Sequence, residues 1–245
     1  MITRRLLALP VLALTAGLCW LPIKTPLNIY DEGLALVGGW RLLHGEIPFR
    51  DYWALYPPGQ SYVLALIFNH FGPTVMAERG YDVVVRAIGA ALIYLVAASL
   101  LPSTALALIA TSAISLLLAA ATFYGYIMFP ALLFAFAALL GYAGYQHKPT
   151  GWRLFGTGLL IGITALFRID VAGYLGIAIA VSLLLQTWRG MTSTPAIAPP
   201  LWRQLLLVVG GALVVAAFGF IWAAFDKHRR TLHDRIAGTI VVRLV

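Results

Sequence analysis

Charged residues are scarce in this sequence. Asp, Glu, Lys and Arg together make up 11% of its 245 residues, whereas hydrophobic residues make up 61%. Soluble domains contain roughly 45–50% apolar residues and about 25% charged ones. This shortage of charge, with a mean hydropathy of +0.89, excludes an ordinary soluble domain and indicates an integral membrane protein.

Cysteine clusters and the common catalytic motifs are also missing. The single cysteine, Cys19, excludes an intramolecular disulfide and a thiolate zinc site. The sequence has no nucleotide-binding glycine loop and no Ser-His-Asp pattern. His228 and His233 are poorly spaced for one helical face, which argues against a metal site between them. We therefore expect no cofactor; a divalent metal is compatible with the sequence but not indicated by it.

A single basic stripe is absent as well. The formal net charge is +8, but the Lys and Arg residues are scattered among the loops. A nucleic-acid-binding protein gathers such residues on one face. No nucleic-acid partner is predicted, and membrane topology explains the basic residues better.

Long hydrophobic runs are what the sequence has in abundance. Runs of about 17–22 residues recur between short polar interruptions, and each can cross a bilayer as a helix. We predict an all-α, polytopic transmembrane helix bundle of about seven spans in residues 1–225. A long first extracytoplasmic loop (24–82) follows the first span. A basic tail (226–245) follows the last span and is interpreted as the start of a missing C-terminal portion. The predicted spans are Leu6–Ile23, Val83–Leu101, Ser103–Thr122, Tyr126–Tyr145, Trp152–Phe167, Val171–Trp188 and Gln204–Phe225.

The positions of the basic residues predict the orientation of these spans. Arg4 and Arg5 precede the first run, which has no small-residue cleavage site, so a retained anchor is favoured over a cleaved leader. With the N-terminus in the cytoplasm, the short internal loops are basic, as the positive-inside rule requires. The internal basic residues are Lys148, Arg153, Arg189 and Arg203. We expect a multi-pass protein of the cytoplasmic membrane, although its basic tail would then lie outside, against the rule.

All nine acidic residues fall on the predicted outer side. Insertion does not require this, because acidic residues contribute little to orientation. The asymmetry favours binding or chemistry on the extracytoplasmic face. The residues are Asp31, Glu32, Glu46, Asp51, Glu78, Asp82, Asp170, Asp226 and Asp234.

The first loop contains two predicted surface helices. Residues 30–44 place Leu36, Trp40 and Leu43 at helical spacing, and Pro58 is suited to begin a second helix. Both helices are expected to lie on the membrane. Aromatic residues between and within them are expected at the height of the lipid headgroups. These are Tyr52, Trp53, Tyr56 and Tyr62.

The run YDEGLALVGGWRLLHGEIPFRDYWALYPPGQSYVLALIF resembles the first extracytoplasmic loop of GT-C glycosyltransferases. This superfamily of polytopic membrane enzymes includes protein mannosyltransferases and aminoarabinose transferases. The run GLLIGITALFRIDVAGYL, residues 158–175, is similar to a later region of the bacterial members. The resemblance covers residues 5–188 and is most specific in the first loop. Members usually run to about twice this length, so the chain is expected to be a truncated member or a fragment.

The resemblance implies an activity and its participants. A sugar passes from a polyprenyl phosphate to a lipid, glycan or protein acceptor outside the membrane, usually with inversion at the anomeric carbon. The family's acidic residue after the first span, which acts as general base, maps to Asp31, and Glu32 follows it. The competing hypothesis is a transporter or non-catalytic subunit that binds and presents polyprenyl-linked sugars. The charges at the outer edges of the spans argue against transport, which places ionisable groups at mid-membrane depth.

Each candidate residue also has a structural interpretation. Asp31 could cap the helix that follows it. Glu32 is expected to accept a hydrogen bond from substrate or bind a metal, or to be a solvated surface charge. Arg168 is expected to hold the donor phosphate, with Asp170 beside it, or the two form an ion pair that closes a helical hairpin. Arg86 is a further phosphate candidate, or it snorkels to lipid headgroups.

The remaining candidates belong to the loop between the surface helices. Arg50 and Asp51 are predicted to contact the substrate, together with Tyr56, or to form salt bridges across the loop with Glu46. A lone histidine such as His44 is more often solvated than catalytic.

Overall fold

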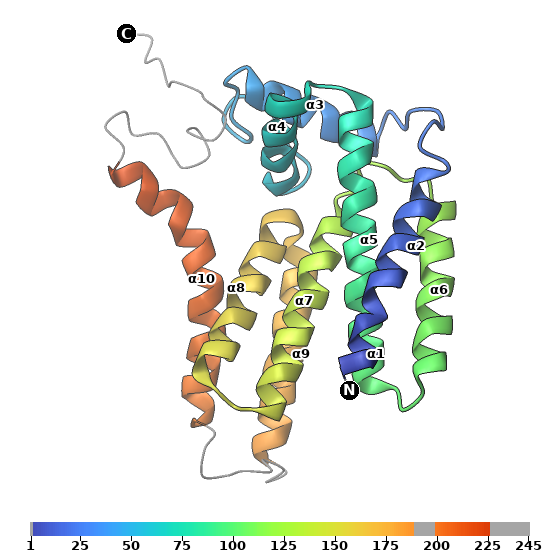
Figure 1. Cartoon of the computed structure of the whole chain (residues 1–245). Helices are drawn as coiled ribbons and strands as arrows, with labels where there is room; N and C mark the ends of the chain where they lie inside the picture. Colours follow the sequence, from blue (N-terminus) through green and yellow to red (C-terminus); the bar gives the residue numbers. More distant parts are fainter. Residues whose placement is uncertain (1, 189–198, 226–245) are drawn as a thin grey trace.

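The computed structural model describes residues 2–188 and 199–225, with side chains from 4–188 and 199–217. Within this range the secondary structure is helical, and no strand forms (Figure 1). The predicted tail (226–245) lies outside the described residues. The helices are α1 (Ile2–Leu6), α2 (Ala8–Trp20), α3 (Asp31–Leu43), α4 (Gly59–Phe71), α5 (Val75–Leu100), α6 (Thr104–Ala120), α7 (Met128–His147), α8 (Gly151–Phe167), α9 (Ile169–Trp188) and α10 (Leu201–Phe225).

Each predicted span coincides with a helix or, for the first, with the α1–α2 pair. Three helices, α5, α7 and α9, are long and apolar enough to cross a membrane by length and composition. The helices α6 and α8 are apolar but shorter, and so is Leu201–Ala217, the part of α10 whose side chains are described. The all-helical class is confirmed, and the count of about seven spans stays a prediction.

Helix α5 begins earlier than predicted. It starts at Val75, with Thr74 as its N-cap, where the side-chain oxygen accepts a hydrogen bond from the Ala77 amide at 3.2 Å. The predicted span began at Val83 because charged residues in the first two turns of the helix lower the local hydropathy. In the structure the side chains of Glu78 and Asp82 are buried against other elements. The last eight residues of the predicted loop therefore belong to helix α5.

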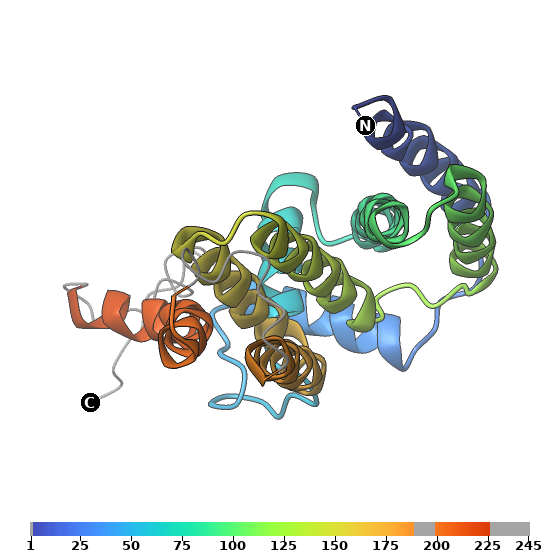
Figure 2. The same ribbon diagram turned by 90° about the horizontal axis from the view of Figure 1, so that it is seen from below.

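The helices form two groups that lie side by side (Figure 2). One group packs α5 against α2 and α6 around Val11, Ala90 and Tyr94. The other packs α8 against α7 and α10, with α9 alongside, around Ala138 and Leu154. Contacts between α5 and α7 join the groups.

Helices α3 and α4 pack on each other at one end of the bundle (Figure 1). Both occur where the surface helices were predicted, but the packed face of α3 is not the predicted apolar stripe. Trp40 is 46% exposed, and α3 instead buries Gly39 and Leu42. A side chain at Gly39 would meet Leu64 and Phe68 of α4 at 2.9 Å, so the glycine permits this close contact.

The acidic residues gather at the same end of the bundle. Seven of them lie among the described residues, in α3, in the α3–α4 connection, and in the first turns of α5 and α9. These segments meet at the end that carries α3 and α4 (Figure 1). The one-sided placement predicted from sequence is present in the fold for these seven residues.

Candidate functional site

A cavity of about 350 Å³ lies at the end of the bundle that carries α3 and α4. One face of α3 forms its first wall, and residues 52–57 form the second. The start of α4 and the α6–α7 connection close it. The polar and charged residues that line this cavity are Asp31, Arg41, Tyr52, Tyr56, Gln60 and Ser61. The cavity unites residues from three separate stretches of the sequence, 31–41, 52–61 and 125–127.

Asp31 lines this cavity from the first turn of α3. The N-cap of α3 is Tyr30, so the prediction that Asp31 caps the helix is wrong. Its carboxylate accepts a long hydrogen bond, 3.5 Å, from the side-chain amide of Asn28. Among the described residues it has no ion-pair partner. A carboxylate with this exposure to a cavity is able to accept a proton from a bound ligand.

Glu32 points away from the cavity into the protein. Its side chain is 1% exposed, so the prediction of a solvated surface charge is wrong. Arg79 of α5 donates to both of its carboxylate oxygens, at 2.5 and 3.0 Å. Glu32 also accepts a hydrogen bond from the backbone amide of Asn28. These contacts fix the first turn of α3, and with it the position of Asp31.

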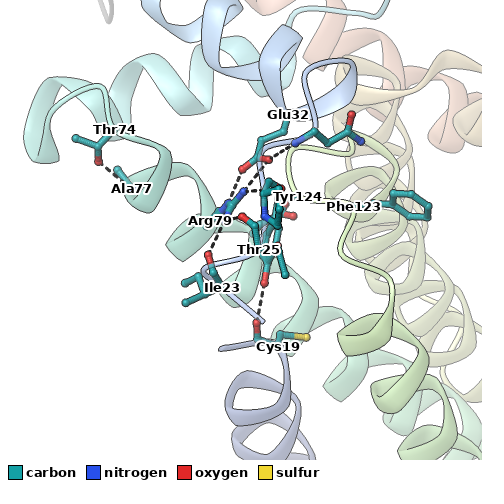
Figure 3. A network of polar contacts seen from close by, with 12 residues as sticks. Cys19, Ile23, Thr25, Glu32, Thr74, Ala77, Arg79, Phe123 and Tyr124 are labelled. Carbon is teal, nitrogen blue, oxygen red and sulfur yellow. Dashed lines mark hydrogen bonds and ion pairs between the residues drawn. The ribbon is translucent and has the colours of Figure 1, made fainter. Parts of the chain in front are cut away.

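Arg79 connects this turn to the end of the first apolar segment (Figure 3). Its Nη1 atom donates to the carbonyl oxygens of Ile23 and Thr25, at 2.6 and 2.8 Å. The guanidinium also stacks on the ring of Tyr124, with 4.8 Å between the guanidinium carbon and the ring centre. Burial of charged groups is costly unless they are paired and hydrogen-bonded, and these contacts offset that cost for Arg79 and Glu32.

Arg86 repeats this arrangement about two helical turns further along α5. It donates to Asp82 at 3.0 Å and to the carbonyl oxygens of Leu118, Ala121 and Phe123. Its guanidinium stacks on the same Tyr124 ring at 4.9 Å. Because the side chain is 1% exposed and does not line the cavity, the structure gives Arg86 a supporting role at the end of α6. It neither snorkels nor faces the site.

Gly125 brings the α6–α7 connection against α3. Its φ of +73° is in the left-handed region, and a side chain there would meet the Cα atom of Glu32 at 2.6 Å. Glycine alone satisfies both conditions at low cost. The carbonyl oxygen of Gly125 accepts a hydrogen bond from Gln60 Nε2 at 2.8 Å.

Gln60 is the buried polar side chain of the cavity wall. The residue is 3% exposed, and its Nε2 atom is engaged by Gly125. Its Oε1 atom is buried and has no hydrogen-bond partner among the described residues. A buried acceptor without a donor costs about 1–3 kcal/mol.

Aromatic side chains and Arg168 stand on the side of the cavity toward α8. Tyr56 lines the cavity and packs with Phe167, the last residue of α8. Arg168 stacks on the Tyr56 ring at 5.0 Å and donates to both carboxylate oxygens of Asp170, at 2.8 and 2.6 Å. The predicted alternative of an Arg168–Asp170 pair is therefore confirmed. The pair lies next to the cavity because Arg168 contacts Tyr56, which lines it.

Arg50 and Asp51 form the salt bridge that was the alternative to substrate contact. Their closest atoms are 2.7 Å apart, and neither residue lines the cavity. The Arg50 guanidinium, and next the backbone amide of Ile47, hold the pKa of the Asp51 carboxyl below its usual value. Nearby, burial raises the pKa of the Tyr52 phenol in the cavity wall.

Sequence reasoning missed three residues that matter for this site. Arg41 lies on the same predicted helix as Asp31, where the aromatic residues give the stronger signal of a membrane interface. Gln60 carries no charge, so neither topology nor hydropathy distinguishes it. Arg79 sat inside the predicted loop, and only its place four residues after Val75 on α5 reveals the burial. No group of three or more metal-ligating side chains occurs in the described part of the chain.

Comparison with known proteins finds a family model that matches one segment of the chain. Residues 183–238 match the model described as the RDD family, a stretch that begins in the last turns of α9 and contains α10. This match and the apolar helices show a membrane-embedded, multi-pass protein. No curated protein and no solved structure matches the chain.

Proposed function

We propose that the chain is a membrane glycosyltransferase that takes a sugar from a polyprenyl-phosphate donor. Asp31 acts as the general base, and the acceptor is a lipid, glycan or protein on the extracytoplasmic face. The observation that carries the proposal is the pairing of two features in one cavity. Asp31, which has no ion-pair partner among the described residues, and the polar side chain of Gln60 both line it.

The reaction divides between an acceptor and a donor. The acceptor hydroxyl oxygen forms a bond to the anomeric carbon, while the bond from that carbon to the phosphate oxygen breaks. Polyprenyl phosphate leaves with the electron pair, and the hydroxyl proton passes to the Asp31 carboxylate. A hydroxyl is a poor nucleophile near neutral pH, and a positioned base accelerates such a step about 10²–10⁴-fold.

Arg168 is suited to receive the donor phosphate. A guanidinium offers two parallel N–H donors, which match phosphate oxygens as well as they match the Asp170 carboxylate. Asp170 is 44% exposed at its side chain, so the present ion pair is open to exchange with a competing anion. Arg168 directly precedes α9, an apolar helix, and the phosphate of a membrane-bound lipid would lie at such a helix end.

The division of labour between Asp31 and Glu32 also supports the proposal. Glu32 is held by Arg79 and assists by fixing the turn from which Asp31 projects. One carboxylate is thus structural, and its neighbour is available to a ligand. The sugar rings would stack on Tyr56 and Trp53, which line the cavity.

The test compares wild type with Asp31→Asn for transfer of radiolabelled sugar from polyprenyl-phosphate donors in membranes at matched expression. We expect transfer to fall about 10²–10⁴-fold while donor binding is retained. Asp31→Glu, which restores a carboxylate, should recover part of the activity. Unchanged transfer in Asp31→Asn would reject Asp31 as the base. Donor binding without transfer in wild type would instead favour a subunit that presents the lipid-linked sugar.

A further inference from the structure

Arg41 is the cationic residue that lines the cavity. It lies on α3, ten residues after Asp31, and at 1.5 Å per residue the two backbone positions are ~15 Å apart along the helix axis. The cavity therefore has an acidic residue at one end of its α3 wall and a basic residue at the other. A ligand that contacts both side chains extends along this wall.

The contacts of Arg41 orient its guanidinium without burying it. The group stacks on the ring of Tyr52 with 4.9 Å between the guanidinium carbon and the ring centre. Its ion pair with Glu46 measures 3.3 Å, and both side chains are more than a third exposed. An exposed pair of this kind contributes about 0–1 kcal/mol, so a phosphate or carboxylate that arrives in the cavity can displace Glu46. Stacking holds the planar donors ready for such an anion.

We propose that the cavity binds an anionic glycan whose phosphate or carboxylate rests on Arg41. That this ligand is the acceptor rests on the proposed function, and in that case its reacting hydroxyl lies at Asp31. Gln60, which also lines the cavity, offers a polar contact between these ends. The acceptor is thus an anionic glycan, such as a short oligosaccharide or the head of a glycolipid, rather than a neutral sugar.

The test measures binding to the purified full-length chain in detergent by calorimetry. The probes are maltose, maltose 1-phosphate, a disaccharide that ends in glucuronic acid, and inorganic phosphate. We expect maltose 1-phosphate to bind at least tenfold more tightly than maltose, and inorganic phosphate to bind more weakly than either charged disaccharide. The glucuronic acid probe decides whether a carboxylate serves as well as a phosphate.

Two variants of the same ion pair make the result specific. Arg41→Gln should abolish the difference between maltose 1-phosphate and maltose, and Glu46→Gln should widen it by removing the competing carboxylate. Both variants break the pair, so a loss caused by the broken pair alone would occur in both. Equal affinities in wild type, or a difference that survives Arg41→Gln, would overturn the inference.

The binding readout is independent of catalysis. Arg41-dependent binding without sugar transfer would refute the proposed function and leave the anion site in place. Transfer in wild type to charged and neutral acceptors alike, with equal binding, would refute the anion site alone.

Discussion

At the scale of single residues, the charges near the site differ in how well each is paired. Glu32 is held by Arg79, and Asp82 by Arg86. Glu78 is also fully buried, and neither of its carboxylate oxygens has a hydrogen-bond partner among the described residues. Two of these three buried acids therefore balance a cation, and the third does not.

This difference predicts that replacing the carboxylate by an amide lowers the stability of the protein much more at Glu32 than at Glu78. Glu32→Gln leaves Arg79 buried without its counter-charge and should cost about 3–5 kcal/mol of stability. Glu78→Gln strands no cation and should change stability by at most about 1 kcal/mol. The measurement is the thermal unfolding midpoint of each variant in the same detergent. Equal losses in the two variants would show that Glu78 shares the Arg79 charge.

Sequence alone predicted pairs that are close along the chain. The Arg168–Asp170 and Arg50–Asp51 pairs were open alternatives because their members are neighbours. The Glu32–Arg79 pair joins residues 47 apart, and no local pattern encodes it. Gly125 shows the same limit, since its need for glycine arises from a contact with Glu32 that only the folded chain contains.

At the scale of elements, hydropathy predicted where the apolar helices lie but not how they pack. The contact of α8 with α10 depends on small residues that allow the backbones to approach. A side chain at Gly158 would collide with the carbonyl group of Val208, whereas one at Gly156 meets nothing within 4 Å. Both glycines lie in the interior of α8.

The two glycines form a matched pair for mutation. Gly158→Ala should destabilise the fold by about 1–3 kcal/mol, because α8 and α10 must move apart. Gly156→Ala should stabilise it by up to about 1 kcal/mol through helix propensity. Chemical unfolding in detergent compares them. A stabilising Gly158→Ala would mean that α10 does not pack on α8 in the membrane.

At the scale of the whole molecule, the fold places all described acids at one end, and the bundle's two ends can be told apart by labelling. A cysteine at Asp51 should react with a membrane-impermeant maleimide in intact cells. A cysteine at His147, exposed at the opposite end, should not. The fully buried native Cys19 supplies little background. Reversed labelling would place the cavity in the cytoplasm and reject the proposed use of an extracytoplasmic donor.

The contacts of Tyr124 have a consequence for biosynthesis. Its hydroxyl donates to the carbonyl oxygen of Cys19, 105 positions earlier in the chain, and its ring receives both buried arginines of α5. The Tyr124 contacts of Cys19 and of both arginines therefore form only after the ribosome has passed residue 124. During that interval Arg79 and Arg86 have their carboxylate partners, Glu32 and Asp82, but lack the aromatic ring that later covers both guanidinium groups, so this end of the bundle is completed only when the α6–α7 connection has been made.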